Sequence, residues 1–158
     1  MADRSLSLEW SRTTPSFNYD SYSRNHIVRF GDGGAVCSSS APEFHGDPRC
    51  LDPEQAFVMS LASCHLLTFL AIASKKGYTV DKYIDKSAAE LGKNKQGKSA
   101  IVKVELRPAV TFSGEKIPSL EEFNALHDRA HRGCIVANTI DGNVAIAVIP
   151  TQIIANSQ

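Results

Sequence analysis

The sequence predicts an α+β fold, organised as one domain around a long central helix. From residue 56 to residue 73 nearly every side chain is apolar or small, and a helix without a polar face must be enclosed by protein or lipid. Segments with a strand pattern precede this helix, follow it as a group, and return after a second helix. Strands and helices grouped in this way favour α+β over a parallel α/β sheet. A chain of 158 residues suits one domain.

Composition excludes several function classes. Lys plus Arg and Asp plus Glu number 17 each, so no global positive field would attract nucleic acid or an anionic membrane. The first ten residues, MADRSLSLEW, lack the apolar core of a secretory signal. The central apolar run is at the lower length limit for a bilayer span, but it is rich in Ser, Thr and Ala and contains His65. These features predict a soluble cytoplasmic protein and no membrane association.

The four cysteines are Cys37, Cys50, Cys64 and Cys134. Because no secretory signal is present, we interpret them as reduced or redox-active thiols rather than as a disulfide framework. Cys37 and Cys50 are expected to be bystanders. Cys64 lies in the middle of the central helix, where a free cysteine is commonly a small core residue.

The N-terminal third is predicted to contain an arm and a hairpin. Residues 1–20 are polar with little periodicity and are expected to form an arm, so that residues 21–158 are the domain itself. Residues 22–30 have a strand pattern, GDGG at 31–34 suits a hairpin turn, and residues 35–39 return as a strand. Residues 40–51 carry two prolines and a glycine, which is typical of a loop.

The central helix has clear start and stop signals. Asp52 is a suitable N-cap, Pro53 suits the first helical position, and Gln55 completes a variant of the capping box. Lys75 suits the negative end of the helix dipole, and Gly77 can adopt the left-handed conformation that closes a helix.

The second half is predicted to alternate between sheet and helix. Residues 79–89 and 100–112 are strand-like, joined by GKNKQGK at 92–98, and in the second strand apolar and charged residues alternate as in an antiparallel sheet with one buried face. A helix begins at Ser119, whose capping box Glu122 completes, and runs to about Gly133. Residues 144–150 form the closing strand.

Two cysteine-containing motifs resemble those of a known family. DPEQAF followed by SLASCHLLTFLA, and AHRGCIVANTI some seventy residues later, closely resemble the OsmC/Ohr superfamily of thiol-dependent hydroperoxide reductases. The resemblance covers most of residues 20–150, and YSRNHIVRF and the GDP before the helix look more like the OsmC-like peroxiredoxin branch than Ohr proteins. It implies an intertwined homodimer in which antiparallel sheets from both subunits wrap two long central helices. It also implies no metal and no organic cofactor.

The resemblance assigns roles to three residues. Cys64 matches the peroxidatic cysteine, Cys134 the resolving cysteine, and Glu54 the glutamate that pairs with an arginine beside the reactive thiolate. Because burial raises the pKa of a thiol and only the thiolate attacks a peroxide, such an arginine is chemically needed. Glu54 and Cys64 are ten residues apart, or roughly 15 Å along a straight helix. They can share a site only if the helix breaks or if Glu54 comes from the other subunit.

The arginine has three candidates. Ohr proteins carry it in the turn after the first strand, where this chain has GDGG, and OsmC proteins carry it upstream of the PE motif, where this chain has Arg49 at a different spacing. Arg24 and Arg29 remain. Being five apart on one predicted strand, they would point to opposite faces, so only one can face the site. Arg24 is the preferred candidate.

The resemblance implies a complete catalytic cycle. The Cys64 thiolate attacks an organic hydroperoxide, or more slowly hydrogen peroxide, and becomes a sulfenic acid. Cys134 condenses with it to form a disulfide, which an external dithiol of the dihydrolipoamide type reduces. An apolar channel for the substrate could be lined by Phe57, Leu61, Leu67 and Phe69.

Two other functions use the same residues. His127, His131 and Cys134 are spaced i, i+4 and i+7, and with Cys64 they would supply zinc-ligand types, which would make the chain a Cys/His metal-binding stress protein without peroxidase activity. A Cys–His hydrolase would form a thioester on Cys64, but the sequence carries no oxyanion-hole signal. His65 projects about 100° away from Cys64 on a helix and is a poor base for it.

Overall fold

The computed structural model describes residues 4–155, and these form two compact units with their boundary between Ala56 and Phe57, inside the central helix. Each unit is described by itself below. The prediction of a single domain over residues 21–158 stays a prediction.

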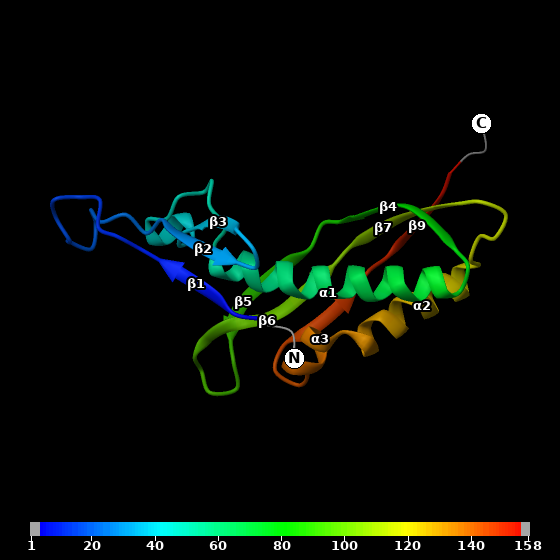
Figure 1. The fold of residues 1–158 in the computed structure, drawn as a ribbon. Helices are drawn as coiled ribbons and strands as arrows, with labels where there is room; N and C mark the ends of the chain where they lie inside the picture. The colour runs from blue at the N-terminus through cyan, green and yellow to red at the C-terminus, as the bar shows by residue number, and fades with distance from the viewer. Residues whose placement is uncertain (1–3, 156–158) are drawn as a thin grey trace. The chain divides into compact units, whose positions relative to one another are not determined.

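The N-terminal unit contains one antiparallel sheet (Figure 1). Its strands, in the order β1-β2-β3, are Leu6–Glu9, His26–Phe30 and Gly34–Ser38. The predicted hairpin is confirmed: Gly31 and Gly33, in the turn between β2 and β3, both have positive φ angles, which glycine adopts without strain. Leu6–Glu9 form a strand that the sequence did not predict, because a four-residue apolar–polar alternation is too short a signal. The N-terminal arm over residues 1–20, of which residues 1–3 lie outside the described residues, stays a prediction.

A disulfide joins Cys37, in β3, to Cys50, in the loop before the central helix, with their Cα atoms 5.0 Å apart. The loop includes the short 3₁₀ helix η1, Pro42–Phe44. The expectation that Cys37 and Cys50 are unpaired bystanders is therefore wrong. The two cysteines are 13 residues apart and meet only in the folded chain, so no local sequence pattern indicates that they pair.

The central helix, α1, spans Pro53–Lys75 and confirms the predicted signals. The Asp52 carboxylate accepts a hydrogen bond from the Gln55 backbone N–H at 2.7 Å, and the Gln55 side chain accepts one from the Asp52 N–H at 3.3 Å. At the other end Gly77 is left-handed, and hydrogen bonds from Tyr78 N to Ala73 O and from Gly77 N to Ser74 O form a Schellman motif.

The C-terminal unit holds two further three-stranded sheets, ordered β4-β7-β9 and β5-β6-β8. The strands are β4 Thr79–Asp85, β5 Ala88–Lys93, β6 Ser99–Leu106, β7 Pro108–Ser113, β8 Ala145–Val148 and β9 Thr151–Ile154. Each long strand predicted from the sequence is thus divided into two, and its halves belong to different sheets. The sheets are also not purely antiparallel, because β8 and β9 run parallel to β6 and β7. Two helices intervene before β8, which is the long connection that parallel pairing requires.

Helix α2, Leu120–Gly133, confirms the predicted capping box. Ser119 accepts a hydrogen bond from the Glu122 N–H at 3.2 Å, and the Glu122 carboxylate accepts one from the Ser119 N–H at 2.9 Å. A short helix that the sequence did not predict, α3, follows at Ile135–Ile140. Cys134 lies between the two helices, as C-cap of α2 and N-cap of α3.

The core of the C-terminal unit consists of two clusters on the sheet-facing side of α1. One gathers around Phe69, Phe112 and Phe123, and the other around Leu61 and Cys134. Leu61 and Phe69 are 1% and 0% exposed, so the prediction that they line a substrate channel is wrong: their place is in the packed core. Within one chain α1 is buried only along the face formed by Leu61, His65, Phe69 and Ala73.

Two histidines form a buried pair between α1 and α2. His65 Nε2 and His127 Nδ1 are 3.0 Å apart, and the ring planes differ by 6°. His127 also stacks on Phe69, with ring centroids 4.3 Å apart. Burial lowers the pKa of His65 to about 4 and that of His127 to about 3, and the proximity of His131 to His65 and of His65 to His127 lowers them further. Both side chains are therefore neutral at pH 7.

This pair predicts a stability loss in mild acid. Because the folded pKa of each histidine lies below the unfolded value near 6.5, the unfolded chain binds protons first, and stability present above pH 6.5 is lost as the pH falls towards 4. We expect the free energy of unfolding in urea to fall by roughly 3–4 kcal/mol between pH 7 and pH 5. In the control, His65→Leu/His127→Leu, this pH slope should flatten. An equally steep slope in the double variant would assign the acid sensitivity to other groups.

Candidate active site

The structure brings Cys64 and Cys134 together within the C-terminal unit. Cys64 is half-buried on α1, and Cys134 is fully buried at the junction of α2 and α3. Both are free thiols, and their side chains are hydrogen-bonded to each other. Two cysteines separated by seventy residues in sequence are thus in position to exchange a proton or to form a disulfide.

The break between α2 and α3 supplies hydrogen-bond donors to both sulfurs. The Cys134 sulfur accepts a hydrogen bond from the Ala137 N–H at 3.3 Å, as an N-cap side chain does. The N–H groups of Ile135 and Val136, in the first turn of α3, hydrogen-bond to Cys64. These first-turn N–H groups have no partner inside their own helix, so they are free to stabilise a negative charge on Cys64.

The two thiols are shifted in opposite directions. Burial raises the pKa of Cys64, but hydrogen bonds from Cys134, Val136 and Ile135 more than offset this, so its pKa is lower than that of an ordinary thiol. Burial, together with the hydrogen bond to Cys64, raises the pKa of Cys134 to about 11. Cys64 is therefore the more readily ionised thiol of the pair, and Cys134 keeps its proton more strongly.

A close helix contact sets the approach of the two cysteines. A Cβ atom built on Gly133, the last residue of α2, would lie 3.1 Å from the Thr68 methyl carbon on α1. Thr68 sits one turn after Cys64, and its hydroxyl donates to the Cys64 carbonyl at 2.8 Å. Glycine at position 133 therefore lets the end of α2, and Cys134 with it, come close to α1.

Glu54 and Arg24, the other two predicted site residues, lie in the N-terminal unit. Glu54 is in the first turn of α1, where a negative charge suits the helix dipole. The Arg24 guanidinium lies 3.9 Å from the Tyr22 ring centroid and 4.9 Å from that of Tyr19, and it donates to the carbonyl oxygens of both residues. α1 runs unbroken from Glu54 to Cys64. The roles of Glu54 and Arg24 beside Cys64 stay predictions.

The reason given for preferring Arg24 needs correction. Arg24 precedes β2, which begins at His26, so Arg24 and Arg29 do not share a strand. Arg29 forms an ion pair with Glu9 at 3.5 Å. Arg49 forms one with Asp47 at 2.8 Å. Within residues 4–155 no ion pair joins Glu54 to any of these arginines.

The metal alternative lacks a preformed site. Among residues 4–155 no three His, Cys, Asp or Glu side chains are grouped as metal ligands. His127 points into the core against His65, and Cys134 against Cys64, so the two candidate ligands have different partners. The N–H donors of Ile135 and Val136 were missed by sequence reasoning. The glycine–cysteine break after α2 was the available signal for them.

Comparison with known proteins identifies the family. A family model described as OsmC-like protein matches residues 45–149. The chain belongs to the OsmC-like family. An OsmC-like protein of unknown function from Vibrio cholerae O1 biovar eltor is 38% identical, with a TM-score of 0.86 over 94% of this chain and all of that one. A search of curated proteins found no match.

More distant relatives share the OsmC-like fold. An organic hydroperoxide resistance protein OsmC from Legionella pneumophila is 20% identical, with a TM-score of 0.65 over 96% of this chain and 98% of that one. The organic hydroperoxide resistance protein OhrB of Bacillus subtilis is 16% identical, with a TM-score of 0.62 over 92% of this chain and 96% of that one. Family membership also explains α1: it is long and apolar enough to cross a bilayer, but in this fold it is the core helix.

The contact at Gly133 yields a prediction. In Gly133→Ala the added Cβ would meet the Thr68 methyl group and push Cys134 from Cys64, so oxidant-induced formation of their disulfide should slow by about tenfold. Thermal stability should not fall, since alanine favours the helix. Adding Thr68→Ser, which removes that methyl group but keeps the hydroxyl, should restore the rate. Wild-type kinetics in Gly133→Ala would show that the close approach is not needed.

Proposed function

We propose that this OsmC-like protein is a cofactor-free, thiol-dependent peroxidase that reduces organic hydroperoxides and, more slowly, hydrogen peroxide. One observation carries the proposal: Cys64 and Cys134 are hydrogen-bonded, and their pKa values are shifted in opposite directions. The thiol that attacks peroxide must ionise readily near neutral pH, whereas the resolving thiol should react only after the first thiol has become a sulfenic acid. The names of the Legionella and Bacillus relatives, which refer to hydroperoxide resistance, agree with it.

The first step is attack of the Cys64 thiolate on a peroxide oxygen. The O–O bond breaks, Cys64 takes one oxygen as a sulfenic acid, and the alkoxide leaves and takes up a proton to become an alcohol. The N–H groups of Ile135 and Val136 hold the sulfur in place for this attack. Because these donors are rigid backbone groups, they need no reorganisation when the substrate arrives.

The second step forms a disulfide and protects Cys64. The Cys134 thiol loses its proton and attacks the sulfenic sulfur, releasing water and leaving a Cys64–Cys134 disulfide. The high pKa of Cys134 keeps it from competing for peroxide before then. An external dithiol, of the dihydrolipoamide type, then reduces this disulfide to two thiols. Such dithiols are kept reduced in the cytoplasm, where we place the protein.

Glu54 and Arg24 complete the proposed site. An arginine beside Cys64 would stabilise the thiolate further and polarise the peroxide, and Glu54 would hold it in place. Glu54 lies ten residues before Cys64 on an unbroken α1, or about 15 Å along its axis. We therefore propose that Glu54 acts in the site of the partner subunit of a homodimer.

Two apolar surfaces of the chain support a homodimer. On α1, Met59 and Leu67 are 54% and 64% exposed, on the side away from the buried face. In the N-terminal sheet, the strand register places Leu6, Leu8 and Phe30 on one face, and all three are at least half exposed. Exposed apolar residues that share one side of a helix or one face of a sheet are candidates for an interaction surface.

The cysteine roles yield a direct prediction. Adding one equivalent of an alkyl hydroperoxide to the reduced protein should consume Cys64 and Cys134 and produce their disulfide, detected by peptide mass spectrometry. Cys64→Ser should slow peroxide turnover with a dithiol by at least roughly a thousandfold, because it removes the nucleophile. Cys134→Ser should reduce one equivalent and then accumulate sulfinic acid on Cys64. Sustained turnover by Cys134→Ser would show that Cys134 does not resolve the sulfenic acid.

The dimer yields another prediction. Leu67→Glu would place a charge in the proposed subunit contact, where desolvation costs several kcal/mol, so the dimer dissociation constant should rise by at least about a hundredfold. Analytical ultracentrifugation measures it, and peroxidase activity should fall in parallel. The matched control is Leu120→Glu, at an equally exposed leucine that begins α2. A dimer of unchanged affinity in Leu67→Glu would exclude this face of α1 from the subunit contact.

A further inference from the structure

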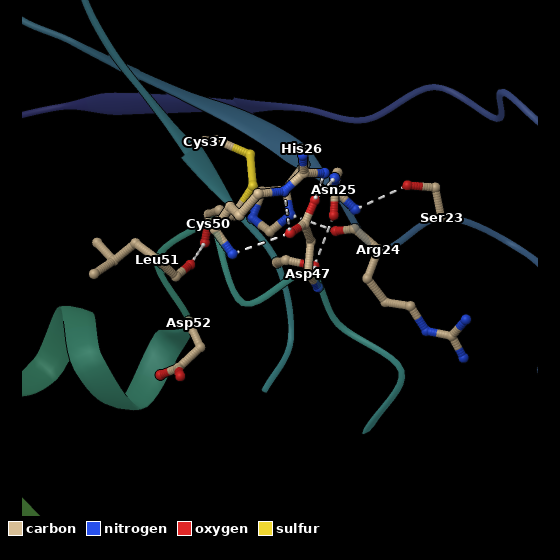
Figure 2. Close-up of a disulfide and its surroundings, with 12 residues drawn as sticks. Ser23, Arg24, Asn25, His26, Cys37, Asp47, Cys50, Leu51 and Asp52 are labelled. Carbon is tan, nitrogen blue, oxygen red and sulfur yellow. Dashed lines mark hydrogen bonds and ion pairs between the residues drawn. A yellow bond between two sulfur atoms is a disulfide. The ribbon is translucent and has the colours of Figure 1, made fainter. Parts of the chain in front are cut away.

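The proposed peroxidase cycle makes no use of the Cys37–Cys50 disulfide. This disulfide joins β3 to the chain segment that leads through Leu51 and Asp52 into the first turn of α1 (Figure 2). Cys50 is two residues before the N-cap Asp52 and four before Glu54. Neither cysteine is fully buried.

Hydrogen bonds beside the disulfide fasten the same segment to β3. The Leu51 N–H donates to the Cys37 carbonyl at 3.0 Å. The Leu51 carbonyl accepts from the Ser39 N–H at 3.1 Å and from the Ser38 hydroxyl at 2.6 Å. The residue between Cys50 and the N-cap is therefore held on both its N–H and its carbonyl side.

Leu51 is covalently followed by Asp52, the N-cap of α1, so its hydrogen bonds to β3 also position the start of the helix. Asp52 is bonded to Leu51 and forms the capping box with Gln55, and the Ala56 N–H closes the first helical hydrogen bond to the Asp52 carbonyl at 2.9 Å. Glu54 lies inside this turn. The direction in which Glu54 projects thus follows from where β3 holds residues 50–52.

The loop before α1 is also held by side-chain hydrogen bonds around Asp47. Asp47 accepts a hydrogen bond from the Asn25 side chain at 3.1 Å, Asn25 accepts one from the Ser39 hydroxyl at 2.9 Å, and Ser39 accepts one from the Asp47 N–H at 3.1 Å. Arg49 pairs with the same Asp47 carboxylate. The Cys50 N–H also donates to the Asp47 carbonyl at 3.0 Å, but the side chains of Cys37 and Cys50 take no part in these contacts, so opening the disulfide would loosen the start of α1 without unfolding the loop.

We propose that the Cys37–Cys50 disulfide, here called the helix-start clip, is a redox-dependent positioning element for Glu54. When oxidised, the clip holds the first turn of α1 rigidly against β3 and keeps Glu54 in the orientation that the peroxidase site uses. When reduced, it leaves that turn to the hydrogen bonds of Cys50 and Leu51, and Glu54 becomes less well placed. The kinetic part of this proposal rests on the proposed peroxidase function.

Both redox steps balance with reagents that the cycle already involves. One thiol of a dithiol attacks a clip sulfur and releases the other cysteine as a thiol, leaving a mixed disulfide. The second thiol of the dithiol then attacks this mixed disulfide and releases the remaining cysteine, so Cys37 and Cys50 together gain two electrons and two protons while the dithiol becomes a cyclic disulfide. In the reverse direction, one peroxide molecule oxidises the two thiols to the disulfide and yields an alcohol and water. Peroxide therefore closes the clip and a dithiol opens it.

The first test measures the start of α1 without any catalysis. In Cys64→Ser/Cys134→Ser protein only the clip can change redox state. Amide hydrogen exchange is compared with the clip oxidised and with it reduced by dithiothreitol. Reduction should speed exchange at Leu51, Gln55 and Ala56 by at least about tenfold, with no change at Phe69 in the later part of α1. Equal exchange in the two states would overturn the proposal.

The second test couples the clip to Glu54. Stopped-flow measurements give the rate constant for Cys64 oxidation by an alkyl hydroperoxide in wild type whose clip mass spectrometry shows to be closed, and in Cys37→Ser/Cys50→Ser. Loss of the clip should lower the rate constant about fivefold, but cause no further loss in a Glu54→Gln background, because the two changes act through one group. The matched control, Ser40→Ala, removes a hydrogen bond to Phe44 inside the same loop and should leave the rate unchanged.

The outcomes separate the two proposals. An equal fivefold loss in the Glu54→Gln background would show that the clip acts elsewhere and would overturn the positioning role. If Cys37→Ser/Cys50→Ser does not fold, the exchange comparison on the reduced and oxidised forms still decides whether the clip holds the helix start. If peroxide oxidises Cys64 in no form of the protein, the peroxidase proposal fails. The hydrogen-exchange comparison then decides by itself whether the clip holds the start of α1.

Discussion

The hydrogen bond between Cys64 and Cys134 is the interaction on which the chemistry proposed for this chain depends. It requires α2 to end against α1 at Gly133, and it requires the chain to break between α2 and α3 at Cys134. The break also releases the N–H groups of Ile135 and Val136 towards Cys64. The junction of α2 and α3 therefore brings the Cys134 sulfur close to Cys64 and also places N–H donors beside the Cys64 sulfur.

This junction shows how a buried apolar setting can still favour a thiolate. Burial alone would raise both thiol pKa values, and for Cys134 it does. Cys64 differs because it receives hydrogen bonds from the side chain and backbone that surround it. The neighbouring His65 contributes no charge, since it is turned into the core against His127 and stays neutral. The opposite pKa shifts of the two cysteines thus come from the placement of hydrogen-bond donors rather than from a nearby base.

The chain carries two cysteine pairs with different surroundings. Cys64 and Cys134 are free thiols in a helical junction of the C-terminal unit, whereas Cys37 and Cys50 are bonded in the N-terminal unit between a strand and a loop. The first pair was singled out in the sequence because the motifs around it resemble those of the OsmC/Ohr superfamily. No motif in the sequence marked Cys37 and Cys50 as a pair. Its partners meet only because β3 and the segment before α1 are hydrogen-bonded neighbours.

The sequence by itself determined the ends of α1 and α2 and the β2–β3 hairpin, since caps, turn glycines and apolar periodicity act over a few residues, and its two cysteine motifs pointed to Cys64 and Cys134 through their resemblance to a known family. Tertiary structure decided how the long strand patterns divide between two sheets, that β8 and β9 pair in parallel, and that α3 exists. It also decided that Leu61 and Phe69 belong to the core. Each of these depends on contacts between distant segments, and such contacts have no signature within any one segment.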